Sequence, residues 1–255
     1  MVLRLPPTEL AYLRSVVDTL RDVLGDTLTG VYPVGSVALD GYVPGRSDID
    51  VLALVDRAPP ASVVGAVAAR LSHDELPCPA TGLEFVLYPP ETVNGVEAGY
   101  LLDLNTGREL PPRIGLDPTD KPRFWYVIDR AICHQCDETL YGPPPHTVLR
   151  PVPFGSLLPV VVESVRAHAA AIAGHGDNAV LNGCRALRFG EQRRWYAKPA
   201  AATWALTAAP DHRRVIASAI ASHRAGRAAG RAVPATDDAA AFLEYVARRL
   251  DRLAD

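Results

Sequence analysis

Two carboxylates stand two residues apart at the start of an apolar run, Asp48-Ile49-Asp50-Val51-Leu52-Ala53-Leu54-Val55. Alternate side chains of a β-strand point to the same face, so we expect Asp48 and Asp50 to lie side by side, roughly 6 to 7 Å apart at their roots. Two like charges at that separation repel by about 2 to 3 kcal/mol at an effective dielectric constant near 20. A divalent cation between them removes this repulsion, so the pair predicts a metal site.

A glycine-serine pair, Gly35-Ser36, precedes the two carboxylates and follows an apolar run that we expect to be a strand. Glycine lets the main chain approach a ligand closely, and backbone N–H groups with a hydroxyl suit a phosphate. A Gly-Ser pair alone is common in turns, but its combination with Ser47-Asp48-Ile49-Asp50 is much more specific. Glu84, at the entrance of a later apolar run, supplies a third carboxylate that a neighbouring strand can present to the same site.

These motifs resemble the nucleotidyltransferase superfamily, in which a Gly-Ser turn is followed by an Asp-x-Asp pair on the next strand. The chain is similar in particular to the aminoglycoside 3''-adenylyltransferase-like proteins and their uncharacterised relatives. The segments that carry this closer resemblance are Leu83-Glu84-Phe85-Val86, Leu140-Tyr141-Gly142-Pro143-Pro144-Pro145, Val180-Leu181-Asn182-Gly183-Cys184-Arg185, Lys198-Pro199 and Thr203-Trp204-Ala205-Leu206. They are spread over most of the chain.

The resemblance implies a magnesium-dependent enzyme that transfers AMP from ATP to a hydroxyl of a small aminoglycoside-like or aminocyclitol-like acceptor, as antibiotic-resistance enzymes do. It implies that Asp48 and Asp50 hold Mg²⁺ and that Glu84 is the general base. Attack on an α-phosphate needs charge neutralisation and in-line positioning, which suits these roles. The nucleotide-binding residues that it implies are Gly35, Ser36, Ser47, Arg185 and Lys198.

The acceptor is less well defined than the reaction. The positions that engage streptomycin in the family fall near Glu109, Arg166, Ala171 and His175, none of which is a tryptophan and only one of which is acidic. Asp177 is displaced from the pattern by a couple of residues. A polycationic drug needs carboxylates to pair with its ammonium groups, so streptomycin is disfavoured as the acceptor.

Two alternatives stay open. One is the same chemistry on another acceptor, namely a natural product, a protein side chain or an RNA end, and the other is a non-catalytic nucleotide-binding module. RNA is the least favoured acceptor because the N-terminal half has no clear basic track. The intact set of three carboxylates argues against a non-catalytic module, because a protein that only binds nucleotides does not need a general base. Trp125, Trp195 and Trp204 are left unassigned, since aromatic residues on helices more often belong to a core.

The order of helical and strand patterns along the chain predicts two domains. Residues 1–150 are expected to form an α/β nucleotidyltransferase domain, in which helices flank a mixed sheet. Residues 151–255 are expected to form an all-α helical bundle. A proline-rich connector at residues 142–153 marks the boundary. In the first domain we expect helices at 8–24, 59–76 and 121–138, strands at 28–34, 48–55 and 83–88, and a weak strand from about residue 100. In the second we expect helices at 155–174, 178–192, 199–208, 211–226 and 236–253. Thr8 and Thr236 are the predicted N-caps.

Charge is distributed unevenly along the chain, whose net charge is only -3. Residues 1–150 carry 20 Asp and Glu against 12 Lys and Arg, whereas residues 151–255 carry 9 against 14. An acidic half suits metal ions or a cationic substrate and a basic half suits phosphates, so we expect the active site between the two domains. Mutual attraction of the two halves is the alternative explanation.

Composition points to a globular protein of the cytoplasm. Apolar residues make up 48% of the chain, and no apolar run approaches the roughly 18 to 20 residues that span a bilayer. The N-terminus has no signal-peptide pattern. The four cysteines are expected to be reduced. Cys133 and Cys136 flank His134, but no second Cys/His pair stands at zinc-finger spacing, which disfavours a zinc site.

Overall fold

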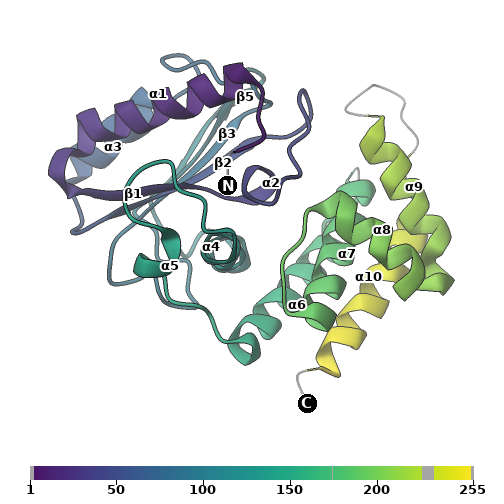
Figure 1. The fold of residues 1–255 in the computed structure, drawn as a ribbon. Helices are drawn as coiled ribbons and strands as arrows, with labels where there is room; N and C mark the ends of the chain where they lie inside the picture. Colours follow the sequence, from purple (N-terminus) through teal and green to yellow (C-terminus); the bar gives the residue numbers. More distant parts are fainter. Residues whose placement is uncertain (1–2, 174, 226–232, 254–255) are drawn as a thin grey trace. The chain divides into compact units, whose positions relative to one another are not determined.

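The computed structural model divides the chain into two compact units, Met1–Val152 and Pro153–Asp255. It describes residues 3–173, 175–225 and 233–253. Figure 1 shows a sheet with helices in the first unit and helices alone in the second, so the predicted fold class is confirmed. Among these three described ranges, none of the helices has the length and apolar character that a bilayer crossing requires.

The first unit is built on a mixed five-stranded sheet in the order β1-β2-β3-β4-β5. Only β2 and β3 are parallel; the other neighbours are antiparallel. A parallel pair needs a crossover, and helix α3, Ala61–Arg70, lies in the connection between β2 and β3. The strands are β1 Leu28–Pro33, β2 Ile49–Val55, β3 Leu83–Tyr88, β4 Leu102–Gly107 and β5 Leu110–Gly115. The first three match the predicted strands to within one residue, and the weakly patterned region becomes the β4–β5 hairpin.

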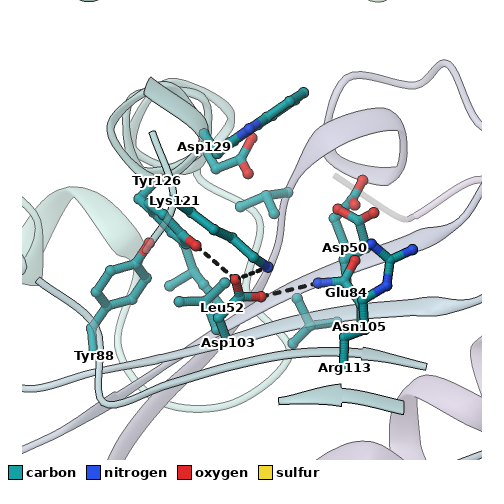
Figure 2. Close-up of a pocket in the computed structure, with 14 residues that line it drawn as sticks. Asp50, Leu52, Glu84, Tyr88, Asp103, Asn105, Arg113, Lys121, Tyr126 and Asp129 are labelled. Atoms are coloured by element: carbon teal, nitrogen blue, oxygen red, sulfur yellow. Dashed lines mark hydrogen bonds and ion pairs between the residues drawn. The ribbon is translucent and has the colours of Figure 1, made fainter. Parts of the chain in front are cut away.

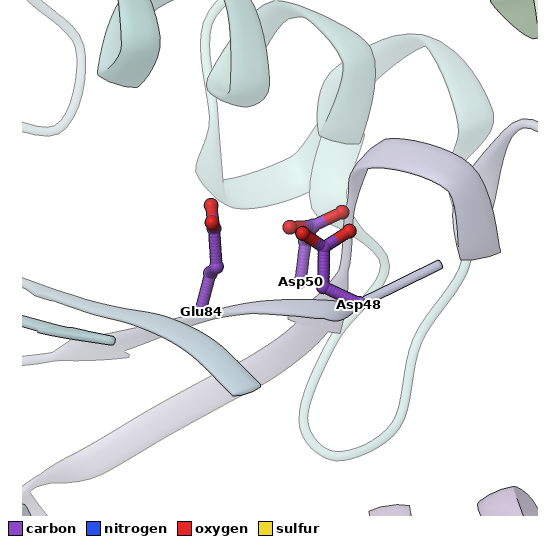
Figure 3. A group of neighbouring side chains, drawn as sticks. All are labelled: Asp48, Asp50 and Glu84. Atoms are coloured by element: carbon purple, nitrogen blue, oxygen red, sulfur yellow. The ribbon is translucent and has the colours of Figure 1, made fainter. Parts of the chain in front are cut away.

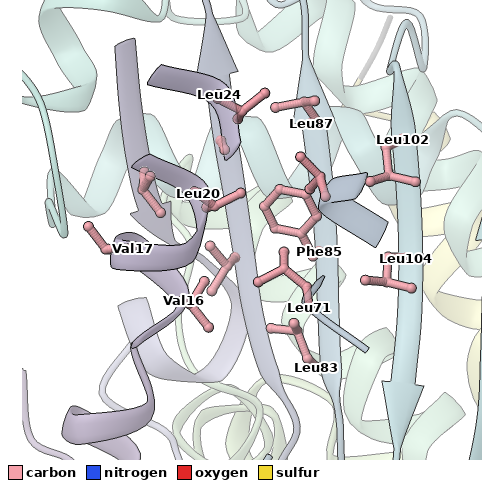
Figure 4. Close-up of a cluster of buried hydrophobic side chains, with 14 of the residues drawn as sticks. Val16, Val17, Leu20, Leu24, Leu71, Leu83, Phe85, Leu87, Leu102 and Leu104 are labelled. Atoms are coloured by element: carbon pink, nitrogen blue, oxygen red, sulfur yellow. The ribbon is translucent and has the colours of Figure 1, made fainter. Parts of the chain in front are cut away.

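The two faces of the sheet are covered by different helices (Figure 1). On one face, α1 and α3 pack on Val51 and Phe85, together with their neighbours in the main apolar core (Figure 4). On the other face, a second core joins Leu52 and Tyr88 to Tyr126 of α4. Because side chains alternate along a strand, Asp50 and Glu84 lie on the α4 face. The remaining helices of this unit are α1 Pro7–Leu24, η1 Gly25–Thr27, α2 Gly35–Ala38, α4 Phe124–Cys136 and α5 Pro145–Val148.

The second unit contains five α-helices within its described residues, at the positions where amphipathic patterns predict them. They are α6 Phe154–Ala170, α7 Gly176–Gln192, α8 Lys198–Ala208, α9 Arg213–Arg224 and α10 Thr236–Asp251, with a 3₁₀ turn η2 at Pro210–His212. The predicted helix ends at positions 174 and 226 lie outside the described residues. Helix α7 contacts α6, α8, α9 and α10, so it is the central helix of the bundle.

Both predicted N-caps are wrong. Helix α1 begins at Pro7, with Pro6 as the cap, and Thr8 instead donates its hydroxyl hydrogen bond to Glu9. Proline is preorganised for the first helical position, which moves the start of the helix ahead of Thr8. Helix α10 begins at Thr236 itself, after Ala235, without a side-chain cap.

The proline-rich segment belongs to the first unit. Tyr141 pairs with Val31 of β1, and the Tyr32 hydroxyl donates a 2.9 Å hydrogen bond to the carbonyl oxygen of Pro143. The segment is therefore held along the edge of the sheet, and the division between the units falls after it, at Val152. The four cysteines all lie in the described part of the chain, and none of them forms a disulfide bond.

Candidate active site

The three predicted carboxylates come together at one end of the central strands. Asp48 directly precedes β2, Asp50 lies in β2, and the parallel register pairs Asp50 with Glu84 of β3. One carboxylate oxygen from each residue lies within 4.8 Å of the others (Figure 3). Paired residues of adjacent strands share a face, which is why two local sequence motifs 34 positions apart form one cluster.

The cluster fits a divalent cation. Three carboxylates at this separation repel one another, and the half-buried positions of Asp48 and Asp50 reduce the screening of that repulsion by water. Carboxylate oxygens are the ligands that Mg²⁺ prefers in proteins. The chemistry of the donor set therefore agrees with the predicted metal ligands Asp48 and Asp50, with Glu84 on the exposed side.

The Gly-Ser turn packs directly against this cluster. The Val34 N–H donates a 3.0 Å hydrogen bond to the Asp50 carbonyl oxygen, and α2 begins at Gly35 with a φ of +55°. A Cβ at Gly35 would overlap the Asp50 carboxylate, lying 2.8 Å from its Cγ. The Ser36 hydroxyl oxygen is buried and has no hydrogen-bond partner among the described residues, which is the state expected of a group that serves a ligand.

Replacing Gly35 by alanine is expected to reduce activity and stability together. The left-handed φ strains any residue with a Cβ, and the added methyl displaces the Asp50 carboxylate. We expect a loss of about 1 to 3 kcal/mol in the free energy of unfolding, measured by urea denaturation. Gly45 also has a positive φ, but a Cβ added there would meet no atom within 4 Å, so Gly45→Ala controls for backbone strain alone. Equal effects of the two substitutions on activity would contradict the contact with Asp50.

Ser47 has a local structural role that the sequence did not predict. Its hydroxyl oxygen accepts a 3.0 Å hydrogen bond from the Val43 N–H, and its own N–H donates to the Val43 carbonyl oxygen at 2.9 Å. These two bonds close the loop that delivers Asp48 to the site. Assignment of Ser47 to nucleotide binding stays a prediction.

A cavity of about 280 Å³ extends from the carboxylates between the sheet and α4 (Figure 2). At its floor, Asp103 accepts hydrogen bonds from Tyr126 at 2.6 Å and from Asn105 at 3.0 Å, and it forms an ion pair with Lys121. Burial, followed by this hydrogen bond, raises the pKa of Tyr126, so its hydroxyl stays a donor. The lining residues are Val34, Asp50, Val51, Leu52, Glu84, Val86, Tyr88, Asp103, Asn105, Arg113, Lys121, Trp125, Tyr126 and Asp129.

The polar residues of this cavity beyond Asp50 and Glu84 were missed by sequence reasoning. The register pairs Glu84 with Asn105 and Asn105 with Arg113, so one row of the sheet carries an acid, an amide and a guanidinium. The alternation of Asp103 and Asn105 in the weakly patterned strand was the available signal. Trp125 also lines the cavity and is 45% exposed, so it does not belong to a core. Trp195, in contrast, is buried and stacks on Phe189.

Arg185 and Lys198 belong to one polar cluster within the helical unit. Arg185 of α7 donates to Asn182 Oδ1 at 3.1 Å, and Lys198, at the start of α8, donates to Asn178 Oδ1 at 2.9 Å. Both cations act on His168 of α6, whose pKa is lowered to about 4 by burial first and by these two charges second. The two residues predicted to contact phosphates are therefore neighbours on the same unit.

Comparison with known proteins identifies this second unit. A family model described as "Aminoglycoside adenylyltransferase, C-terminal domain" matches residues 147–249. Residues 147–249 are therefore similar to the C-terminal domain of aminoglycoside adenylyltransferases. No curated protein matches the chain in sequence. The predicted resemblance to aminoglycoside adenylyltransferase-like nucleotidyltransferases, and with it the enzyme class, is confirmed.

The fold of the chain is similar to that of one solved structure over almost its whole length. This is the crystal structure of spectinomycin adenyltransferase AAD(9) from Enterococcus faecialis with ATP and spectinomycin. The TM-score is 0.70 at 17% sequence identity, and the match covers 95% of this chain and 99% of the other. The sheet unit and the helical unit thus have a known fold.

Two of the positions compared with streptomycin contacts have other partners within the helical unit. Arg166 forms a 2.7 Å ion pair with Asp251 of α10. Asp177 is buried and accepts a 2.9 Å hydrogen bond from Ser222 of α9. Both residues therefore tie helices of this unit together, which accords with the absence of the streptomycin pattern from the sequence.

Proposed function

We propose that the protein transfers AMP from ATP to a hydroxyl group of a small aminoglycoside-like or aminocyclitol-like acceptor, in a magnesium-dependent reaction. The observation that carries this proposal is the cluster of Asp48, Asp50 and Glu84 against the Gly35-Ser36 turn. The similarity of residues 147–249 to the adenylyltransferase C-terminal domain supports the reaction class. The structural neighbour, which binds ATP and spectinomycin, supports ATP as the co-substrate and an aminoglycoside-like acceptor.

Each residue of the cluster has a role in this reaction. Asp48 and Asp50 would hold Mg²⁺, which supplies neutralisation of the phosphate charge when bound. Glu84 accepts the proton of the acceptor hydroxyl, whose oxygen attacks the α-phosphorus. The new phosphorus–oxygen bond forms as the bond to the leaving pyrophosphate breaks, so atoms and charge balance.

Roles in phosphate binding are proposed for two separate sets of residues. The buried hydroxyl of Ser36, with the N–H groups of Gly35 and Ser36, is suited to phosphate oxygens because it lacks a partner in the described part of the chain. Within the helical unit, Arg185 and Lys198 are proposed to contact phosphate groups through their two positive charges, and Ser47 stays a further candidate. Phosphate recognition by an arginine and a lysine is expected for a nucleotide with three anionic groups.

The acceptor is assigned to the cavity beyond Glu84. Trp125 of α4 offers an exposed ring face, and Asp129, one helical turn further on, offers a carboxylate to the same cavity. The lining carries charges of both signs, with two cations, Arg113 and Lys121, and four carboxylates, Asp50, Glu84, Asp103 and Asp129. A compact hydroxylated ring with few ammonium groups suits this mixture better than an extended polycation does.

Replacing Trp125 by alanine is expected to raise the KM for the acceptor by about 5- to 10-fold, the equivalent of losing one aromatic face. The KM for ATP should stay unchanged because the proposal assigns Trp125 to the acceptor and not to the nucleotide. Steady-state pyrophosphate release, with each substrate varied in turn, measures both constants. Trp125→Phe keeps a ring and should retain most of the acceptor affinity. An equal rise for ATP and acceptor in Trp125→Ala would contradict the assignment.

The function is tested by incubating the protein with ATP, Mg²⁺ and mixtures of candidate acceptors, followed by mass spectrometry. The expected result is an acceptor that gains the mass of one AMP, together with release of pyrophosphate. Labelled nucleotide appearing on protein or RNA would favour those acceptors instead. Tight ATP binding without turnover on any acceptor would overturn the proposal and favour a nucleotide-binding module.

A further inference from the structure

A chain of polar contacts inside the helical unit ends at Arg185. The first link joins His168 Nδ1 to the Ser164 carbonyl oxygen at 2.7 Å. A carbonyl oxygen only accepts hydrogen bonds, so Nδ1 carries the proton at this link. In the neutral imidazole the other ring nitrogen, Nε2, is then an acceptor.

The second and third links follow from the first. Asn182 Nδ2 lies 3.0 Å from His168 Nε2 and therefore donates to it. This places Asn182 Oδ1 toward Arg185, whose Nη2 donates to it at 3.1 Å. Asn182 is buried, with 8% of its surface exposed, so its amide has little freedom to adopt another orientation. Every contact from Ser164 to Arg185 then pairs a donor with an acceptor.

The arrangement of this chain depends on the protonation state of His168. A protonated ring would present Nε2–H to the Asn182 amide, two donors would face each other, and a flipped amide would turn its NH₂ group toward the Arg185 guanidinium. Burial among cations disfavours that state. Arg185 of α7 and Lys198 of α8 both act on the ring, and the pKa of His168 is lowered to about 4.

We propose that His168 is a positioning residue that, through Asn182, holds the guanidinium of Arg185 in one orientation. Trp195 lies beneath the same group, with the Arg185 Cζ 5.9 Å from its ring centroid, and limits the guanidinium from another side. A guanidinium that is already fixed in its binding orientation loses less side-chain entropy when it binds an anion. The consequence for ATP rests on the proposed contact of Arg185 with phosphates, whereas the orientation itself does not.

The orientation is tested by NMR on the full-length protein without nucleotide. The ¹⁵N shifts of the His168 ring are expected to show the proton on Nδ1, and the ring should stay neutral as the pH falls from 8 to 5. In Asn182→Asp the carboxylate favours the protonated ring, so the pKa of His168 should rise. A proton on Nε2, or titration of wild-type His168 near pH 6.5, would overturn the proposal.

The effect on nucleotide binding is tested with two substitutions of His168. His168→Gln keeps an acceptor near the place of Nε2 and is expected to retain the KM for ATP. His168→Leu removes it and should raise that KM by about 5-fold, the equivalent of one ordinary hydrogen bond, with little change in kcat. His134→Leu alters a half-buried histidine on α4 of the other unit and should leave the KM unchanged.

A double-mutant cycle separates the positioning role from general damage. If His168 acts through Arg185, then His168→Leu has no further effect on the KM for ATP in an Arg185→Ala background. Additive effects of the two substitutions would overturn the positioning role. If Arg185→Ala itself leaves the KM for ATP unchanged, the proposed phosphate contact is wrong. The NMR result still decides whether His168 orients Arg185 through Asn182.

Discussion

Replacing Glu84 by glutamine is expected to lower kcat by about 10²- to 10⁴-fold, the usual contribution of a general base. Glutamine keeps the length and hydrogen-bonding shape of the side chain but does not accept the proton of the acceptor hydroxyl. Because Glu84 lies on the exposed side of the carboxylate cluster, the KM for ATP should change little. Pyrophosphate release with ATP and acceptor varied separately measures both effects.

A matched control for this substitution is Glu75→Gln, which changes an exposed glutamate between α3 and β3 of the same unit. It should retain full activity. Calorimetric titration of Glu84→Gln with ATP and Mg²⁺ shows whether nucleotide binding survives. A variant that binds ATP and still turns over at more than a tenth of the wild-type rate would exclude Glu84 as the base.

The second large effect is expected from the double substitution of Asp48 and Asp50 by asparagine. Without the two carboxylates, the site loses its proposed hold on Mg²⁺, and kcat/KM should fall by about 10³-fold or more, corresponding to ~4 kcal/mol of transition-state stabilisation. Titration of the variant with ATP should give the same heats with and without Mg²⁺. If the heat of ATP binding still depended on Mg²⁺ in this variant, Asp48 and Asp50 would not be the metal ligands.

The same double variant should be more stable than the wild type when no metal is added. Three carboxylates within 4.8 Å of one another repel, and removing two charges relieves this repulsion. Thermal unfolding in the presence of a chelator is expected to show a higher Tm for the variant. The pair Asp18→Asn and Asp22→Asn, on α1 of the same unit, removes equal charge away from the cluster and should leave both Tm and activity unchanged. A higher Tm for the Asp48 and Asp50 variant alone would show that these carboxylates lower stability and are retained for function.

Much of the architecture follows from local pattern. The apolar residues of α1, α6 and α10 recur at helical spacing, and the runs at β2 and β3 are short, apolar and bounded by turn residues. The first residues of the helices were predicted less well. Thr8 and Thr236 have side chains that can cap a helix, but α1 begins at Pro7 and α10 begins at Thr236 itself. The β4–β5 hairpin was only partly anticipated, since β5 is an exposed edge strand whose sequence has no alternating pattern.

The sequence by itself determined that Asp48 and Asp50 lie close together, because they are separated by one residue where the chain enters β2. Only the tertiary structure decided that Glu84 stands opposite Asp50, because register between strands depends on the whole sheet. The same holds for the hydrogen bonds to Asp103 and for the polar contacts that lead from His168 to Arg185, because the residues involved come from different elements. Side-chain spacing along a chain is a local property, whereas hydrogen-bond partners across elements are selected by packing, which no single segment encodes.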